Sequence, residues 1–171
     1  MEKEDLPLFV EWVNEPEVSG EYNPLRQMSK TEAEKMFETP HEKKSFIIEK
    51  KDGSKIGFIV HFYVLHIAGK QLEIGYSLVP SERGKGYCSE AVKIMVDYLF
   101  LSKETMRIQA QTDQRNVASQ KVLEKVGFKK EGILRKNFFM RGEWREAYIY
   151  SILREEWKEP KILTRTTWEM G

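Results

Sequence analysis

Cysteine and histidine are scarce in this 171-residue sequence. The single cysteine, Cys88, excludes an intramolecular disulfide and favours a reducing compartment. The three histidines, His41, His61 and His66, do not show the spacing of zinc ligands. We therefore expect no metal site.

Long hydrophobic runs and an excess of one charge are also missing. No apolar stretch approaches the roughly 20 residues that span a bilayer, and the segment Met1–Asp5 has no signal-peptide character. The 28 basic and 27 acidic side chains leave a formal net charge of +1. This balance gives no electrostatic basis for binding nucleic acid or an anionic membrane. The sequence predicts a cytoplasmic protein that binds neither.

The composition that remains is typical of a globular protein: 40% of the residues are hydrophobic and 32% are charged. Neither an internal repeat nor a low-complexity linker divides the chain. We expect residues 1–160 to form a single domain and residues 161–171 to form a C-terminal tail.

Hydrophobic periodicity and capping residues predict helices in four places. These are a helix that begins at Asp5, one opened by the capping box Ser29–Glu32, one over Glu90–Leu101 that begins near Ser89, and one capped by Asn116 and ended by Gly127. The segment Asn14–Gln27, with Pro16, Gly20 and Pro24, is predicted to be a loop.

Alternating apolar residues predict six strands. They are Ser45–Glu49, Ile56–Tyr63, Leu72–Val79, Arg107–Thr112, Ile133–Phe139 and Trp144–Leu153. Gly53 and Gly142 suit hairpin turns between two pairs of them. The order of elements indicates an α+β fold with one sheet.

A loop with two glycines, Gly84 and Gly86, lies between a predicted strand and a predicted helix. Successive backbone N–H groups in such a loop, together with a helix N-terminus, form an anion site. Arg83 and Lys85 add positive charge. The spacing matches neither a Walker loop nor a full dinucleotide fingerprint. From these residues alone, a phosphate cradle and a plain tight connection both stay open.

Three ordered segments give the chain a family resemblance. Arg83-x-x-Gly86-x-Cys88 resembles the cofactor signature of the GNAT family of N-acetyltransferases. The segment Asn116–Phe128 looks like the second cofactor segment of that family. The segment Gly142–Tyr148 is similar to the closing hairpin of its Rim-type branch, which acetylates ribosomal-protein N-termini. The resemblance extends from about Asp5 to Trp157.

The resemblance implies a central, mostly antiparallel mixed sheet with helices on both faces. The sheet would be splayed into a V between the family's strands 4 and 5, here Leu72–Val79 and Arg107–Thr112, with acetyl-CoA in the gap. The implied cofactor-binding residues are Leu78, Val79, Arg83, Gly84, Lys85, Gly86, Tyr87, Cys88, Ser89, Asn116 and Ser119. Members of the family usually have a strand before the first helix, whereas this sequence begins almost at that helix.

Proton transfer is assigned by the same resemblance. Glu73 lies on the strand that borders the gap, where relatives often have an acid, and is the candidate base; a salt-bridged strand carboxylate is the alternative. The tyrosine acid of many relatives is replaced by Leu123. Ser119, one turn earlier, is the candidate proton donor to the leaving thiolate. The alternative is that its side chain only bonds to a backbone carbonyl of the helix. The N–H of Leu78 is the candidate oxyanion donor.

The acceptor is less well defined. The candidates to line its pocket are Tyr22, Trp144 and Tyr148. For each of them, a structural place in the core or on the surface is an equally open interpretation. Cys88 is favoured as a small packing residue over a nucleophile. The sequence therefore predicts an N-acetyltransferase that acts on a protein N-terminus or a small amine. The family resemblance also allows a homodimer. The alternative is a non-catalytic module that senses acyl-CoA.

Overall fold

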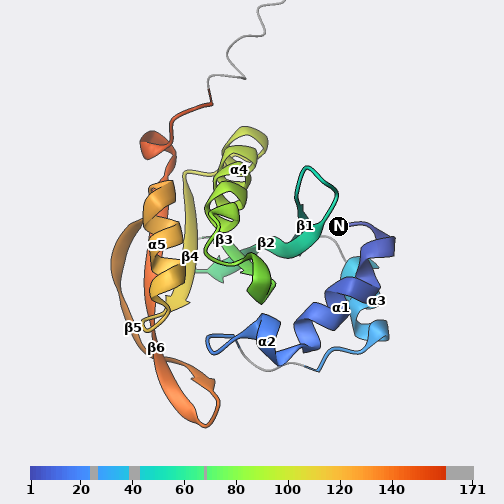
Figure 1. Ribbon diagram of the computed structural model, residues 1–171. Helices are drawn as coiled ribbons and strands as arrows, with labels where there is room; N and C mark the ends of the chain where they lie inside the picture. Colours follow the sequence, from blue (N-terminus) through green and yellow to red (C-terminus); the bar gives the residue numbers. More distant parts are fainter. Residues whose placement is uncertain (24–26, 39–42, 68, 161–171) are drawn as a thin grey trace, which may run out of the picture.

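The computed structural model describes residues 1–23, 27–38, 43–67 and 69–160. Pro24, His41 and the predicted tail 161–171 lie outside them. The chain begins with helices, and further helices separate some of the later strands (Figure 1). The order is α1 (Leu6–Asn14), α2 (Pro16–Ser19), α3 (Lys30–Glu38), β1 (Lys43–Glu49), β2 (Lys55–His66), β3 (Gly69–Leu78), α4 (Tyr87–Ser102), β4 (Arg107–Asp113), α5 (Val117–Val126), β5 (Lys129–Met140) and β6 (Glu143–Leu153). The α+β class and the six strands are confirmed. No helix among the described residues is long and apolar enough to cross a membrane.

The six strands form one sheet in the order β1-β2-β3-β4-β6-β5. Every neighbouring pair is antiparallel except β3 and β4, which are parallel. The pairing of β3 with β4 is limited to Leu72 with Ile108 and Glu73 with Gln109. Beyond these residues the two strands separate toward their carboxyl ends. The predicted V between these two strands is confirmed.

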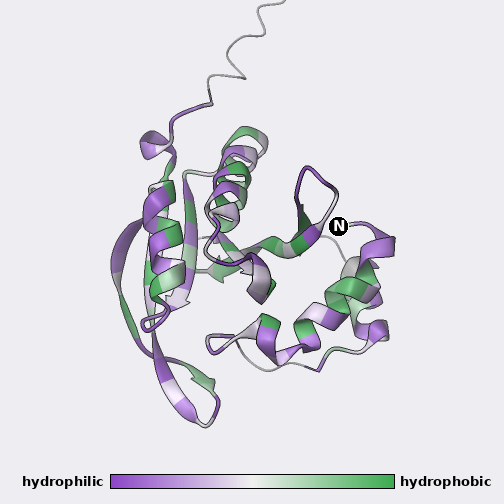
Figure 2. Cartoon of the chain, in the orientation of Figure 1, coloured by the Kyte–Doolittle hydropathy of each residue, from purple (hydrophilic) through white to green (hydrophobic). Residues whose placement is uncertain are grey.

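Helices cover both faces of the sheet, as predicted. On one face, α4 and α5 pack against each other and against a core whose most buried side chains include Leu72, Val92, Leu99, Ile108, Leu123 and Tyr150. On the other face, Phe9 of α1 meets Phe58 of β2 with 5.1 Å between ring centroids. In Figure 2, α4 and α5 have hydrophobic and hydrophilic residues on different sides, the pattern of helices with one buried face.

The predicted helix signals are mostly confirmed by the hydrogen bonds at the helix ends. At the start of α3, Ser29 N donates to Glu32 Oε2 over 2.7 Å, and Glu32 N donates to Ser29 Oγ over 3.2 Å. At the start of α5, Asn116 Oδ1 accepts from Ser119 N over 3.1 Å. Gly127 ends α5 in the left-handed conformation, with φ of 108°.

Two boundaries differ from the prediction. The short helix α2 lies inside the segment predicted to be a loop, because Pro16 suits the first helical position and Gly20 ends the turn with φ of 65°. The helix predicted to begin near Ser89 begins at Tyr87, because Gly86, with φ of 89°, allows the chain to turn into the helix two residues earlier.

Candidate active site

The main chain of β3 has an unpaired edge where it leaves β4. Val79 N donates to Ile56 O of β2 over 2.9 Å. Because main-chain groups alternate between the two sides of a strand, the N–H groups of Leu78 and Tyr76 point the other way, into the gap. Val79 O accepts from Glu82 N over 3.1 Å. Of the two residues expected along the pantetheine arm, Leu78 is therefore the one that presents an N–H to the gap.

A cleft of about 730 Å³ occupies the gap and the space in front of it. It is lined by residues from α2 and the following loop, β3, the glycine loop, α4 and α5. The predicted site residues that it brings together are Tyr22, Leu78, Arg83, Gly84, Gly86, Cys88, Ser89, Asn116 and Ser119. Segments that lie up to a hundred residues apart in the sequence thus form one site.

The glycine loop is open toward the cleft at the start of α4. Gly84 and Gly86 have φ of 77° and 89°, and no atom lies within 4 Å of the position where either would place a Cβ. The first N–H groups of an α-helix have no partner within the helix, so those of Tyr87, Cys88 and Ser89 remain for a ligand. This end of the cleft fits a pyrophosphate, by its concave backbone and the positive end of the helix dipole.

Arg83 has a structural role that its position in the motif does not indicate. Its guanidinium donates to three main-chain carbonyls: Nε to Leu78 over 3.0 Å, and Nη2 to Glu17 over 3.1 Å and to Val18 over 2.7 Å. It therefore fixes α2 to the end of β3. The ammonium of Lys85 is paired with Glu82 at 3.2 Å.

Ser119 is joined to a tyrosine that the sequence analysis did not single out. The hydroxyls of Tyr76 and Ser119 lie 2.9 Å apart, and Tyr76 Oη also donates to Ser119 O over 3.3 Å. Burial raises the pKa of the Tyr76 phenol above its usual range, so the phenol stays protonated. Strand alternation was the available signal, since it places Tyr76 on the face of β3 that α4 and α5 cover.

Glu73 lies on the opposite face of β3 and is held by amides. Its side chain is buried, and Oε2 accepts from Gln109 Nε2 over 2.8 Å and from Gln111 Nε2 over 3.2 Å. Asn137 Nδ2 donates to Gln111 Oε1 over 2.8 Å and thereby orients that amide. The two amides fix the orientation of the carboxylate on this face of β3.

Cys88 lines the cleft as a half-buried thiol. Burial raises its pKa to about 12. A thiol with this pKa is protonated at neutral pH, whereas a nucleophilic cysteine needs a thiolate. The packing interpretation is thus the one that its surroundings favour.

Several predicted residues lie outside the cleft. Tyr87 lines a different hollow, between α4 and β1. Tyr148 lies under the ammonium of Lys130, 3.2 Å from the ring centroid. Trp144 is 56% exposed at the tip of the β5–β6 hairpin, where its ring packs against Phe139. The structure does not bring Trp144 and Tyr148 together with Glu73.

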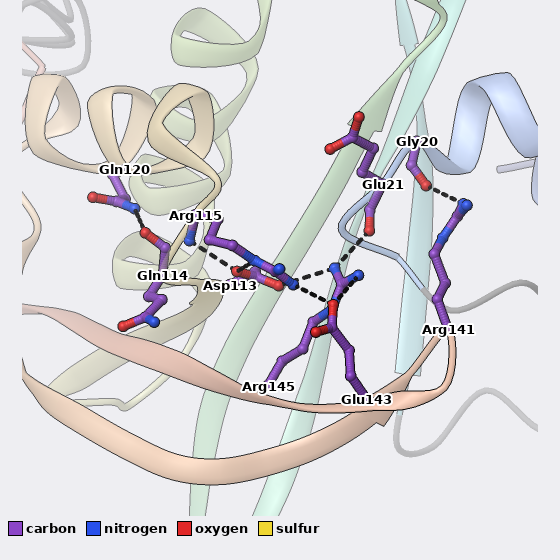
Figure 3. Close-up of polar contacts among 9 residues, drawn as sticks. All are labelled: Gly20, Glu21, Asp113, Gln114, Arg115, Gln120, Arg141, Glu143 and Arg145. Atoms are coloured by element: carbon purple, nitrogen blue, oxygen red, sulfur yellow. Dashed lines mark hydrogen bonds and ion pairs between the residues drawn. The ribbon is translucent and has the colours of Figure 1, made fainter.

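The β5–β6 hairpin is bonded to the loop after α2 by two arginines (Figure 3). Arg141 Nη2 donates to Gly20 O over 2.8 Å, and Arg145 Nη1 donates to Glu21 O over 2.9 Å. These two bonds connect segments more than a hundred residues apart and hold the loop that bears Tyr22 at the cleft.

Buried charge anchors this connection at the end of β4. Asp113 has a fully buried side chain whose Oδ2 accepts from Arg145 Nη1 over 3.2 Å, while Oδ1 accepts from Arg115 N over 2.8 Å. Glu143 joins both arginines, at 3.0 Å from Arg115 Nη2 and 2.9 Å from Arg145 Nη2. We call Asp113, Arg115, Glu143 and Arg145 the hairpin clamp.

A splayed sheet with an open strand edge, and a glycine loop at the N-terminus of the next helix, define an acyl-CoA-dependent acyltransferase. A family model described as an acetyltransferase (GNAT) domain matches residues 1–129. The chain belongs to this family and is an N-acetyltransferase. It is 38% identical to a probable N-acetyltransferase of Bacillus subtilis, over 72% of this chain and 68% of the relative. It is 30% identical to an uncharacterized N-acetyltransferase of Bacillus licheniformis, over 92% of each.

Two solved structures show the same fold. RimJ of Mycobacterium smegmatis, in complex with CoA-disulfide, matches with a TM-score of 0.79 and 26% identity, over 93% of this chain and 82% of that one. Spermidine N-acetyltransferase of Vibrio cholerae, in complex with CoA and spermine, matches with a TM-score of 0.81 and 21% identity, over 91% and 94%.

Within the part of the chain that the structure describes, no three His, Cys, Asp or Glu side chains are grouped so as to hold a metal ion. That the enzyme works without a metal remains a prediction.

Proposed function

We propose that the enzyme transfers an acetyl group from acetyl-CoA to a primary amine, on a protein N-terminus or a small molecule. The observation that supports this most is the unpaired edge of β3, which opens into a cleft ending at the glycine loop. A pantetheine arm fits such an edge as an added strand would, and a pyrophosphate fits the loop. The structures of RimJ and of spermidine N-acetyltransferase that share the fold contain CoA-disulfide or CoA.

The residues that would hold acetyl-CoA are assigned along the cleft. The N–H of Leu78 faces the pantetheine arm, the backbone amides from Gly84 to Ser89 face the pyrophosphate, and Asn116 and Ser119 line the α5 side. Acetyl-CoA supplies the acetyl group as a thioester, which an amine attacks directly.

The proton transfers are divided between the two faces of β3. An amine with a pKa of about 10 is mostly protonated at neutral pH, so it must lose a proton before it attacks. Glu73, oriented by hydrogen bonds from Gln109 and Gln111, accepts that proton directly or through water. As the C–N bond forms and the C–S bond breaks, the Leu78 N–H stabilises the oxyanion and Ser119 donates its hydroxyl proton to the thiolate sulfur. The proton that the acetylated nitrogen then loses restores the Ser119 hydroxyl.

The Tyr76–Ser119 pair favours catalysis over the sensor alternative. That alternative was based on Leu123, which replaces the family's tyrosine donor. Either hydroxyl can donate in the 2.9 Å contact between Tyr76 Oη and Ser119 Oγ, and with Tyr76 as the donor the Ser119 hydroxyl hydrogen is left for another acceptor. A protonated donor is thus available in the cleft although position 123 lacks one.

The acceptor class is assigned more broadly. The Rim-type resemblance favours a protein N-terminus, and a relative of 28% identity is a spermidine N(1)-acetyltransferase of Escherichia coli. We propose a primary amine as the common feature. We further propose that residues 1–160 form one domain. The homodimer and the cytoplasmic location remain predictions.

The test is thiol release from acetyl-CoA with a panel of peptides, polyamines and monoamines. At least one amine should release thiol in proportion to acetylated product. Glu73→Gln should lower kcat about 100-fold, with little change in the KM for acetyl-CoA, because a neutral amide accepts no proton. Glu104→Gln, on an exposed turn, is the matched control. Binding of acetyl-CoA without thiol release from any amine would contradict the proposal.

A further inference from the structure

A second hollow, of about 250 Å³, lies between α1 and the sheet. Aromatic rings form much of its wall: Phe9 and Trp12 from α1, and Phe58 and Phe62 from β2. Gly75 of β3 lies in its floor. We call this hollow the aromatic pocket.

The aromatic pocket is on the same face of the sheet as Glu73. Phe62 is the cross-strand partner of Glu73, and Gly75 follows Glu73 by two residues, so all three face the same side. Tyr76, by contrast, is paired with Ile59, whose side chain lies in the core under α4. The pocket is therefore on the side of β3 from which the candidate base acts.

The aromatic pocket is continuous with the cofactor cleft. Five residues line both hollows: Val18, Ser19, Asn23, Tyr76 and Ser77. An amine placed where the two hollows meet has the cleft on one side and the aromatic pocket on the other. A substituent of that amine therefore enters the pocket.

The size and the walls of the pocket define the substituent. A cavity of about 150 Å³ holds a benzene molecule, so a single ring or a branched aliphatic chain fits here. Lys43 also lines the pocket, and its ammonium repels a second ammonium group of the substrate. The pocket thus matches an apolar group and disfavours a polyamine.

Resting on the proposed function, we propose that the aromatic pocket selects acceptor amines with a single-ring or branched aliphatic substituent. An N-terminal residue with such a side chain, or a small arylalkylamine, has this chemistry. Gly75 keeps the floor of the pocket open. A Cβ there would lie 3.5 Å from Val60 Cγ2, an ordinary contact, so alanine fits and a larger side chain extends into the pocket.

The first test measures binding and needs no turnover. Phenethylamine is titrated calorimetrically into the protein saturated with CoA. We expect saturable binding that is at least tenfold weaker in Gly75→Val, intermediate in Gly75→Ala, and unchanged in Gly132→Ala, a β5 glycine with open space at its Cβ position. Thermal melts verify that the variants fold. Absence of saturable binding, or equal binding by wild type and both Gly75 variants, overturns the inference.

The second test separates this inference from the proposed function. The kcat/KM for phenethylamine relative to that for spermidine should exceed one in the wild type and fall at least tenfold in Gly75→Val. If both amines are acetylated and the ratio does not change, the pocket assignment is wrong while acetyl transfer stands. If no amine releases thiol, the proposed function fails, and the binding experiment still decides whether the pocket accepts apolar amines.

Discussion

At the scale of single residues, the site depends on the two-residue period of β3. Glu73 points to the face that bears the aromatic pocket, whereas Tyr76 points toward α5 and meets Ser119. In the proposed mechanism, one strand thus carries the proton acceptor for the amine and supports the proton donor to the sulfur. Because the two groups lie on opposite faces, they do not compete for the same space.

The pairing of Tyr76 with Ser119 predicts coupled effects. Tyr76→Phe and Ser119→Ala should each lower kcat about tenfold, because a hydrogen bond worth about 1.5 kcal/mol is lost. The double variant should be little slower than the slower single variant, because both changes disrupt the same hydrogen-bonded pair. A thiol-release assay on the four proteins measures this cycle. If the reduction in kcat of the double variant equals the product of the two single reductions, the shared role is contradicted.

The sequence revealed some of these residues and missed others for a physical reason. Asn116 and Ser119, which line the cleft, were singled out because they lie within a motif of local spacing. Tyr76 was missed because its partner is 43 residues away, and only the fold brings the two hydroxyls together. Arg83 was assigned to the cofactor from its motif, but its guanidinium holds the carbonyls of α2 and β3, which no local pattern indicates.

At the scale of elements, the hairpin clamp joins β4, β6 and the loop after α2 (Figure 3). Asp113 is fully buried, and the Arg145 side chain is only 9% exposed. A buried ion pair contributes little net stability against an apolar replacement, but removing one partner leaves an uncompensated charge. The clamp therefore holds the loop in one position at the cleft.

Removal of Arg145 should release that loop. Arg145→Ala is expected to lower the free energy of unfolding by about 2 kcal/mol, since the Arg115 guanidinium, with Nε 3.4 Å from Asp113 Oδ1, continues to pair with Asp113. Amide hydrogen exchange should become faster around Gly20 and Glu21. Arg135→Ala, an exposed arginine of β5, serves as the control for lost charge. Unchanged exchange in the loop of Arg145→Ala would show that the clamp does not position it.

Element boundaries followed from the sequence wherever a cap defined them. Ser29 with Glu32, and Asn116 with Gly127, were found because their hydrogen bonds are local. The helix α2 was missed because four residues show no periodicity, and part of its support comes from Arg83, more than sixty residues away.

At the scale of the whole molecule, His61 makes the stability of the fold depend on pH. It is 3% exposed between Phe46 and Tyr98, and neither ring nitrogen has a hydrogen-bond partner in the described part of the chain. Burial, together with the charges of Lys103 and Lys44, lowers its pKa from 6.5 to about 4. The folded protein therefore keeps this imidazole neutral at a pH where the unfolded chain is protonated.

The sign of the effect follows from linkage. Above pH 6.5 both states are neutral at this site and the full stability is present; as the pH falls from 6.5 to 4, only the unfolded state binds a proton, and stability is lost. The loss should reach at most about 3 kcal/mol. Urea denaturation of the wild type and His61→Phe at pH 7 and pH 5 measures it. The pH dependence should be smaller in the variant, and equal dependence would refute this role.

The fold class could be predicted from the sequence, whereas the positions of the hollows could not. The order of elements predicted an α+β fold with one sheet, because strand and helix periods are local. The family resemblance predicted that this sheet is split. The aromatic pocket depends on side chains of α1, β2 and β3 meeting in space. A further groove of about 800 Å³ between β1 and α4 is as large as the proposed cofactor cleft, so size alone does not identify the site.

A crystal structure with bound acetyl-CoA tests the central claim most directly. The account predicts the pyrophosphate at the backbone amides from Gly84 to Ser89, the pantetheine arm along the open edge of β3, and the sulfur within hydrogen-bond reach of Ser119 Oγ. Density for acetyl-CoA in the groove between β1 and α4, with the gap between β3 and β4 empty, would contradict it.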